Sequence, residues 1–230
     1  MELAPIFKAA KKGDLKKVTE LHLSGEDLNQ THKNGASALI YAAENGHFDV
    51  VKYLIENGAN PAVQTKMGGT ALNRAAEIGD IKIMKYLLEN GTPIGDLALI
   101  VAAREGSVDA VKLLVESGAD VNAKQRWGQS ALMLAAREGH SDVVKFLLDS
   151  GADVRLKDKN GDTALNIAMD NDNMDIAMQL RRAGAKAQVK KKTVPEPIDE
   201  DEDDSTDEMD ELISEDGEDV PDDVDLDEEI

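Results

Sequence analysis

One segment recurs six times within the first 185 residues, and this recurrence limits the fold more than any other feature of the sequence. The segment SALIYAAENGHFDVVKYLIENGAN at 37–60 aligns with SALMLAAREGHSDVVKFLLDSGAD at 130–153. A fixed period of about 20–50 residues predicts a solenoid, in which each unit buries its apolar face against its neighbours. The glycines that mark the copies are spaced by 33, 33, 27, 33 and 33 residues, and they are Gly25, Gly58, Gly91, Gly118, Gly151 and Gly184.

Each copy predicts two short helices joined by a turn. A hydroxyl residue precedes the pattern Ala-Leu-x-x-Ala in four copies, where it can cap the free amides of the first helix. A glycine then ends that helix, because glycine accepts the left-handed backbone of a helix C-cap. The second helix, as in residues 48–55, carries apolar residues on one side. The four capping residues are Ser37, Thr70, Ser130 and Thr163.

The period of 33, the sequence GADVN at 118–122 and the sequence EGH at 138–140 resemble the ankyrin repeat. The resemblance covers roughly residues 1–185 and implies an all-α solenoid of stacked helix-turn-helix units with short β-hairpin fingers. The family's T-P-L-H motif is replaced by Ser-Ala-Leu-Ile, Thr-Ala-Leu-Asn, Leu-Ala-Leu-Ile, Ser-Ala-Leu-Met and Thr-Ala-Leu-Asn, so its proline and histidine are missing. The expected units are about 1–33, 34–66, 67–93, 94–126, 127–159 and 160–185, followed by a basic linker at 186–192.

The remaining residues, 193–230, form a separate acidic segment. The whole chain has 26 Lys and Arg against 46 Asp and Glu, for a net charge of −20, and 21 of the acidic residues lie after Lys192. Like-charge repulsion and scattered apolar residues predict a disordered acidic tail. Three roles stay open. The tail could be a solubilising appendage, it could bind a basic partner or compete for the groove of the repeats, or its run 199–204 could collect divalent cations weakly.

The sequence predicts no enzyme, no cofactor and no metal site. It has no cysteine, which excludes disulfides, thiolate zinc sites and a cysteine nucleophile. None of the four histidines is paired at metal-ligand spacing, and no phosphate-binding loop or nucleophile elbow is present. His47 and His140 each follow a turn glycine in the same register, which predicts a structural role.

The composition also limits the kinds of partner and the cellular location that we expect for the protein. No apolar run approaches the ~18 residues of a membrane span, and no secretory signal precedes the repeats, so we expect a cytoplasmic protein that does not bind membranes. Phosphate would repel the acidic segment, so we expect no nucleic-acid partner. We expect a monomer that binds a protein.

One interval is shorter than the others. Gly58 to Ala71 spans 13 residues, whereas Gly91 to Ala98 spans only 7. The missing residues fall where the family projects a finger, so the fourth unit is expected to lack a full finger. Two interpretations stay open, because loops tolerate deletions at little cost but the gap could also admit or bound a partner.

The resemblance implies that fingertips and first helices line a concave binding surface. Residues there differ from copy to copy, and Trp127, the only tryptophan, stands at a fingertip beside Arg126. Tryptophan and arginine are enriched at interface hot spots, although the indole could instead fill a hollow against a neighbouring finger. Arg104 and Arg137 could pair with carboxylates of a partner or could simply be solvated. The predicted contact residues are Asn34, Lys66, Met67, Ile78, Arg104, Arg126, Trp127, Gln129, Arg137 and Lys159.

Two functional hypotheses follow. The first is a non-enzymatic protein-binding module, a scaffold or adaptor, that uses its concave face and fingertips and is tuned by the acidic tail. The alternative is a polyanionic binder that masks or chaperones basic proteins, or mimics nucleic acid, through the tail.

Overall fold

The structure, a computed structural model, describes residues 3–186. The predicted acidic tail and all of the predicted linker except Lys186 lie outside the described residues. The helices of the described part are α1 (Pro5–Lys12), α2 (Leu15–Leu23), α3 (Ala38–Glu44), α4 (Phe48–Glu56), α5 (Ala71–Ile78), α6 (Ile81–Glu89), α7 (Asp96–Arg104), α8 (Val108–Glu116), α9 (Ala131–Glu138), α10 (Ser141–Asp149), α11 (Ala164–Asp170) and α12 (Met174–Arg182).

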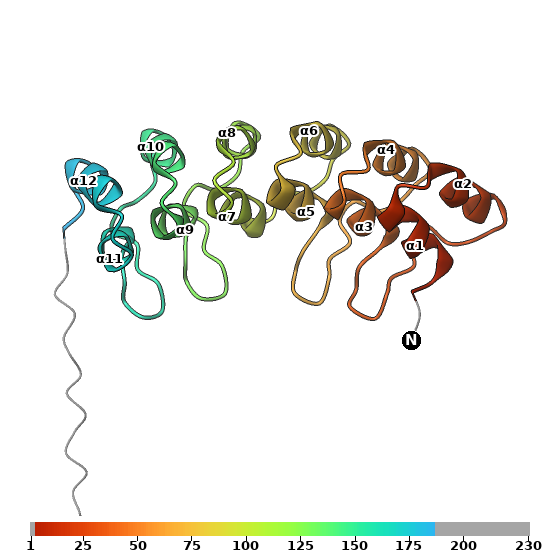
Figure 1. The fold of residues 1–230 in the computed structure, drawn as a ribbon, viewed down its shortest axis with the longest axis horizontal. Helices are drawn as coiled ribbons and strands as arrows, with labels where there is room; N and C mark the ends of the chain where they lie inside the picture. The colour runs from red at the N-terminus through yellow and green to blue at the C-terminus, as the bar shows by residue number, and fades with distance from the viewer. Residues whose placement is uncertain (1–2, 187–230) are drawn as a thin grey trace, which may run out of the picture. The chain divides into compact units, whose positions relative to one another are not determined.

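The helices form two layers of neighbours. Each odd-numbered helix contacts the even-numbered helix that follows it and also the odd-numbered helices of the adjacent units (Figure 1). The even-numbered helices make a second row of the same kind. The prediction of stacked helix-turn-helix units is therefore confirmed. None of the helices within residues 3–186 combines the length and the apolarity that crossing a membrane requires.

The first helices begin where the sequence predicts. Thr70 Oγ1 accepts a hydrogen bond from the amide of Asn73 at 3.2 Å, and the other three predicted caps, Ser37, Ser130 and Thr163, do the same in their units. The other two first helices have no side-chain cap: α1 follows Ala4, and α7 begins at Asp96 after Gly95. In the repeat register, α7 therefore starts two residues earlier than the other Ala-Leu helices, because no full finger holds the chain away from it.

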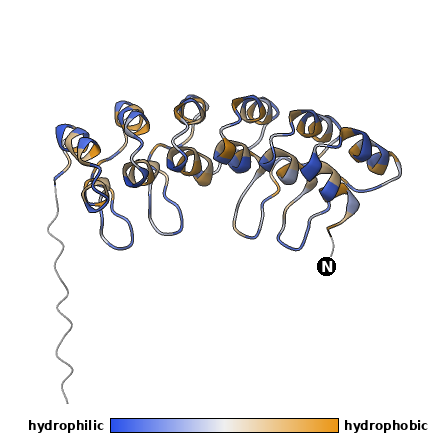
Figure 2. Ribbon diagram, viewed as in Figure 1, coloured by the Kyte–Doolittle hydropathy of each residue, from blue (hydrophilic) through white to orange (hydrophobic). Residues whose placement is uncertain are grey.

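The core lies between the two layers and between adjacent units. Alanines of the first helices are fully buried, and they let these helices approach closely, while leucines and valines of the second helices fill the space behind them. Hydrophobic residues accordingly concentrate on the helices, whereas the connecting loops are largely polar (Figure 2). The buried hydrophobic residues of the described part extend from Ile6 to Ala185, so every unit contributes to one continuous core.

Histidines connect adjacent units. His47 Nε2 donates to the carbonyl oxygen of Lys11 at 3.0 Å, and His140 Nε2 donates to that of Arg104 at 2.8 Å. Each ring lies against a glycine of the preceding unit with positive φ, and a Cβ on Gly106 would come within 2.6 Å of the His140 ring. These contacts support the structural role that the sequence predicts for both histidines.

We call the long loops between units fingers, and they are residues 24–37, 57–70, 117–130 and 150–163. Each closes on a tight turn, as in the 57–70 finger, where the amide of Thr65 donates to the carbonyl of Gly69 at 2.9 Å. The hairpins reach only isolated antiparallel bridges, Thr31 with Ser37 and Lys124 with Ser130. The loop 90–95 between α6 and α7 makes no such turn within the described residues and does not project with the fingers (Figure 1). The fourth unit therefore lacks a finger, as predicted.

Candidate functional site

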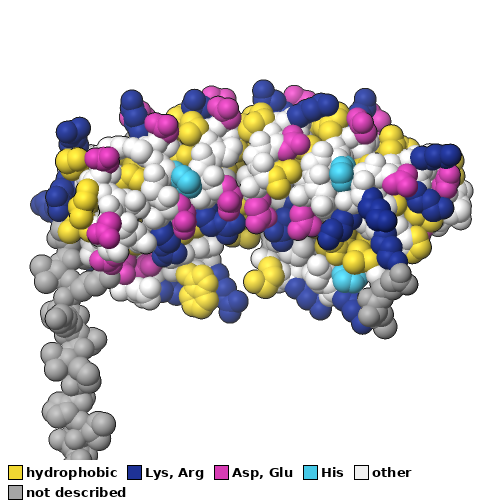
Figure 3. Space-filling view, in the orientation of Figure 1, with side chains coloured by type: hydrophobic (Ala, Val, Ile, Leu, Met, Phe, Trp, Pro, Cys, Tyr) yellow, Lys and Arg dark blue, Asp and Glu magenta, His cyan; other side chains and the backbone are white. Residues whose placement is uncertain are grey.

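The missing finger leaves a cleft of about 670 Å³ between the fingers 57–70 and 117–130. Side chains of these two fingers form its opposite walls, and α5 and α7 contribute the remaining lining. In the space-filling view, hydrophobic side chains lie on the projecting loops on both sides of the hollow (Figure 3). The cleft is therefore a direct consequence of the short interval in the sequence.

A large apolar side chain is exposed on each wall. Met67 is 83% exposed on the finger 57–70, and Trp127 is 61% exposed on the finger 117–130. Leu97 and Val101 add apolar surface from α7 between them. Since Trp127 is mostly exposed, the indole does not fill a hollow against a neighbouring finger, which was the alternative that the sequence left open.

Each wall is fixed to a second finger on its outer side. The amide of Lys66 donates to the carbonyl of Asn34 at 2.8 Å, and the amide of Lys159 donates to that of Trp127 at 3.0 Å. Gly128 has φ +76°, and a Cβ there would lie 3.2 Å from the Lys159 amide nitrogen, so a larger residue would strain the backbone and push the two fingers apart by a few tenths of an ångström. The fingers therefore form two tied pairs, one on each side of the cleft.

Two cations flank the indole of Trp127. The guanidinium carbon of Arg126 lies 5.7 Å from the ring centroid, and Lys159 Nζ lies 5.9 Å from it. Both distances are at the outer range of cation–π attraction. The wall at Trp127 therefore combines a broad apolar surface with positive charge.

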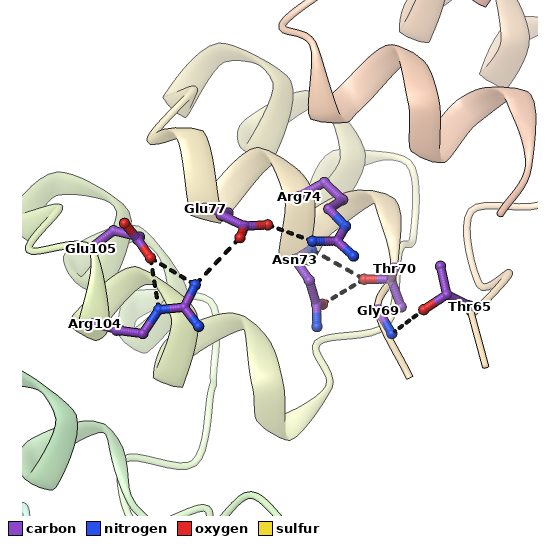
Figure 4. Close-up of polar contacts among 8 residues, drawn as sticks. All are labelled: Thr65, Gly69, Thr70, Asn73, Arg74, Glu77, Arg104 and Glu105. Atoms are coloured by element: carbon purple, nitrogen blue, oxygen red, sulfur yellow. Dashed lines mark hydrogen bonds and ion pairs between the residues drawn. The ribbon is translucent and has the colours of Figure 1, made fainter. Parts of the chain in front are cut away.

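The lining from α5 and α7 carries an ion-pair network (Figure 4). Glu77 accepts from Arg74 Nη1 at 2.6 Å and from Arg104 Nη2 at 3.3 Å, so one carboxylate joins the two helices. Arg104 also pairs with Glu105 at 2.7 Å. These side chains are about a third to two fifths exposed, so the pairs orient the guanidinium groups more than they stabilise the fold.

Five of the ten residues predicted as contacts line this cleft, and they are Lys66, Met67, Arg104, Arg126 and Trp127. Asn34 and Lys159 are exposed and support the walls through their backbones. Ile78 is 47% exposed, but its side chain lies beside Gly46 of the preceding unit. Arg137 belongs to the fifth unit, on α9, and does not line the cleft. The cleft therefore brings together five of the ten predicted contact residues. Ile78 and Arg137 lie elsewhere on the stack.

The structure buries Gln129, which the sequence predicts as a contact residue. Its side chain is only 8% exposed, and its Oε1 accepts a hydrogen bond from Gln125 Nε2 at 2.8 Å. Its carbonyl also closes the turn of the finger by accepting from the Gln125 amide. Gln129 therefore holds the finger together and presents little surface to a partner.

The sequence interpretation missed several lining residues, of which Arg74 is the clearest. It stands where four other copies carry Tyr41, Val101, Leu134 and Ile167, and only the first copy, with Lys8, also has a charge at this position. This departure from the repeat was the signal that could have identified it. The other lining residues with charged or apolar side chains that are absent from the predicted contact list are Glu77, Asp96, Leu97, Val101 and Lys124. No group of three or more His, Asp or Glu side chains within residues 3–186 is placed to hold a metal ion.

A family model described as ankyrin repeats (3 copies) matches the chain twice, at residues 6–98 and 99–191. Together these matches cover most of the sequence. The chain belongs to the ankyrin repeat family. The resemblance deduced from the repeat period and from the sequence GADVN is thereby confirmed, and the helical stack described above is the fold of that family.

Curated relatives match over short stretches of these ankyrin repeats. Human ankyrin repeat domain-containing protein 39 is 44% identical over 54 residues, which is 24% of this chain and 30% of that protein. Myotrophin from Xenopus tropicalis is 44% identical over 52 residues, 23% of this chain and 44% of myotrophin. The chain thus spans less than half the length of these curated relatives.

A solved structure matches over a much longer range. One chain in the complex of a predatory endopeptidase from Bdellovibrio bacteriovorus with an immunity protein aligns with a TM-score of 0.70 and 29% identity. The alignment covers 79% of this chain and 99% of that chain. The similarity therefore extends over the whole length of that neighbour rather than over one or two repeats.

Proposed function

We propose that this ankyrin repeat chain is a non-enzymatic protein-binding module whose contact surface is centred on the cleft beside its fourth unit. Ankyrin repeats are generally protein–protein interaction modules. The observation that carries the proposal is the pair of exposed apolar side chains, Met67 and Trp127, on opposite walls of the cleft. Concave sites that combine apolar side chains with a few charged groups are typical of binding surfaces.

The construction of the walls supports the same proposal. Tied fingers hold Met67 and Trp127 without a partner, so binding orders little backbone and loses little conformational entropy. Tryptophan and arginine together at the centre of a contact surface are the usual hot-spot residues. Arg126 and Trp127 are therefore the residues whose removal should cost the most affinity.

The test is protein capture with a double variant. We expect Trp127→Ala with Arg126→Ala to weaken retention of a partner from a native lysate at least tenfold, with an almost unchanged melting temperature, because both side chains are exposed. Lys112→Ala with Lys145→Ala provides a matched control on exposed positions of α8 and α10, outside the cleft. Equal retention by the cleft variant and the control would remove the cleft from the proposed function.

We also propose that the acidic segment 193–230 tunes this binding. Its charge would raise association rates with basic surfaces and make them sensitive to salt. Binding through the acidic segment alone, as a polyanion that masks basic proteins, is the competing function. Removing residues 193–230 separates these two functions, because the shortened chain keeps its whole described core. It should still capture a partner if the cleft binds that partner, and it should lose capture if the acidic segment alone binds it.

A narrower second candidate comes from the solved neighbour. One chain of an endopeptidase–immunity protein complex matches this chain over 99% of its own length. We therefore propose an endopeptidase as the second candidate partner, with inhibition as the outcome. The purified chain would then slow peptide hydrolysis by a co-purifying endopeptidase, and the Trp127→Ala, Arg126→Ala variant would not. A captured partner without peptidase activity would reject this candidate and leave the binding function in place.

A further inference from the structure

Most of the charged side chains that line the cleft are basic. Its charged lining consists of five basic side chains, Lys66, Arg74, Arg104, Lys124 and Arg126, and two acidic ones, Glu77 and Asp96. Glu77 already pairs with both Arg74 and Arg104. The ion pairs of the described residues include none at Lys66, Lys124 or Arg126. Three cations on the two walls are therefore available to an anionic partner.

These cations lie on the same fingers as the exposed apolar side chains. Lys66 is adjacent to Met67 on one finger, and Arg126 is adjacent to Trp127 on the other. Lys124 is exposed on the same finger as Trp127, its Nζ donates to the carbonyl of Lys157 at 3.1 Å, and its charge also acts on the Asp153 carboxylate without forming an ion pair among the described residues. Each wall therefore presents an apolar surface with a cation beside it.

The size of the cleft limits what can occupy it. About 670 Å³ lies within the range of sites that enclose a ligand of a few hundred daltons, which is much more than one side chain and far less than a domain. A short chain segment fits this volume. A segment with no apolar residue would leave Met67, Leu97, Val101 and Trp127 without a partner.

We propose that the cleft binds an acidic segment of the partner protein that carries one bulky aliphatic or aromatic side chain. The apolar side chain lies between Met67 and Trp127. Carboxylates on either side of it pair with Lys66 on one wall and with Lys124 and Arg126 on the other. This inference rests on the proposed function and names the chemistry of the surface that the cleft recognises.

Trp127 provides the readout, because it is the only tryptophan of the chain. The probes are three nine-residue peptides without aromatic residues, all with blocked ends. The first has a central leucine flanked by Glu and Asp, the second has Lys in place of every acidic residue, and the third has Ser in place of the leucine. We expect the first to change Trp127 emission in the full chain with a Kd at least tenfold below those of the other two. Equal binding of the basic or serine peptide, or no binding of the first, would overturn the proposal.

Reversing the charge of Lys66 and Lys124 tests whether the peptide's carboxylates lie against them, and it keeps Trp127 as the fluorescent reporter. We expect Lys66→Glu with Lys124→Glu to lower the affinity for the acidic peptide at least tenfold and to make the basic peptide the tighter ligand. Lys112→Glu with Lys145→Glu makes the same change in net charge outside the cleft, and we expect it to stay within about threefold of the unmodified chain, because solution salt screens distant charges. Equal losses in both variants would show that net charge alone governs binding and would contradict the proposed site.

The two proposals fail in different ways. If the Trp127→Ala, Arg126→Ala variant loses its captured partner but the acidic peptide does not bind, the cleft binds a protein of other chemistry and only this inference is wrong. If the acidic peptide binds at Trp127 but capture of the partner is unaffected by the cleft variants, the proposed function is wrong.

Discussion

Arg104 Nη2 lies 3.3 Å from Glu77 Oε1, and this ion pair joins α7 to α5 beside the cleft. The two residues belong to units whose connecting loop is short, so no finger separates the cleft from this pair. Glu77 also holds Arg74 at 2.6 Å, and a single carboxylate therefore neutralises part of a basic surface. Glu77 consequently limits how strongly the cleft attracts an anion.

The first prediction concerns this carboxylate. Glu77→Gln removes one negative charge from the cleft and releases Arg74 from its ion pair, while Arg104 keeps its pair with Glu105. We therefore expect the acidic leucine peptide to bind about threefold to tenfold more tightly. The free energy of unfolding should change by less than about 1 kcal/mol, because partly exposed pairs contribute little. Trp127 emission measures binding and thermal melting measures stability. Glu89→Gln on α6 is the control, and tighter binding in both variants would exclude a local effect.

A second prediction concerns the wall that carries Trp127. Gly128 and Gly161 both have positive φ, but only Gly128 would place a Cβ against a neighbouring backbone. We expect Gly161→Ala to cost about 1–2 kcal/mol of unfolding free energy from the left-handed backbone alone, and Gly128→Ala to cost more. Gly128→Ala should also weaken partner capture, because it separates the two fingers. Denaturant unfolding that gives the same cost for both variants would argue against the tied pair.

A third prediction uses the repeated histidines as a matched pair. His140 and His47 make the same bond to the preceding unit, but only His140 bonds the carbonyl of Arg104. We expect His140→Ala and His47→Ala each to lower the unfolding free energy by about 0.5–1.5 kcal/mol, the value of one hydrogen bond. Only His140→Ala should weaken partner capture, because Arg104 lines the cleft. If both variants reduced capture equally, general loosening of the stack would be responsible.

A fourth prediction concerns pH. Hydrogen bonds from the Arg155 side chain and amide hold the pKa of Asp153 below its ordinary value of 3.8. Because this pKa is lowered in the folded chain, the contribution of Asp153 to stability is complete above its unfolded pKa and is lost as the pH falls through the lower folded value. Arg155→Gln should raise the pKa of Asp153 partway toward 3.8, since the amide bond remains. An NMR titration of the carboxyl carbon measures this, and an unchanged pKa would show that the side chain has no effect.

The sequence predicted much of the fold because the fold is a repeat of local units. Caps such as Thr70 and turn glycines such as Gly139 determine helix ends within a few residues, and the apolar pattern recurs in register with them. The missing finger was also predictable, because a change in the interval between glycines requires a change in loop length. These features depend on neighbours in the chain, which the sequence shows directly.

The candidate site was only partly predictable because it depends on how the stack aligns residues of different units. Arg74 pairs with Glu77 three residues along α5, but Arg104 reaches Glu77 only after α5 packs on α7, and the sequence spacing does not reveal this second contact. Gln129 varies among the copies as a contact residue would, yet its variation reflects the bond to Gln125 within the finger. Variation between copies therefore identifies fingertips but does not separate exposed residues from those that close the turn.

The central claim is that the absence of the fourth finger creates the binding site, and restoring the finger tests this most directly. Six residues inserted between Thr92 and Asp96 give the 13-residue interval of the other units and place a finger between Met67 and Trp127. Because loop insertions cost little stability, the melting temperature should stay nearly constant. We predict that the restored chain loses partner capture at least tenfold. Capture at the affinity of the original chain would contradict the claim, because the cleft would then be unnecessary for binding.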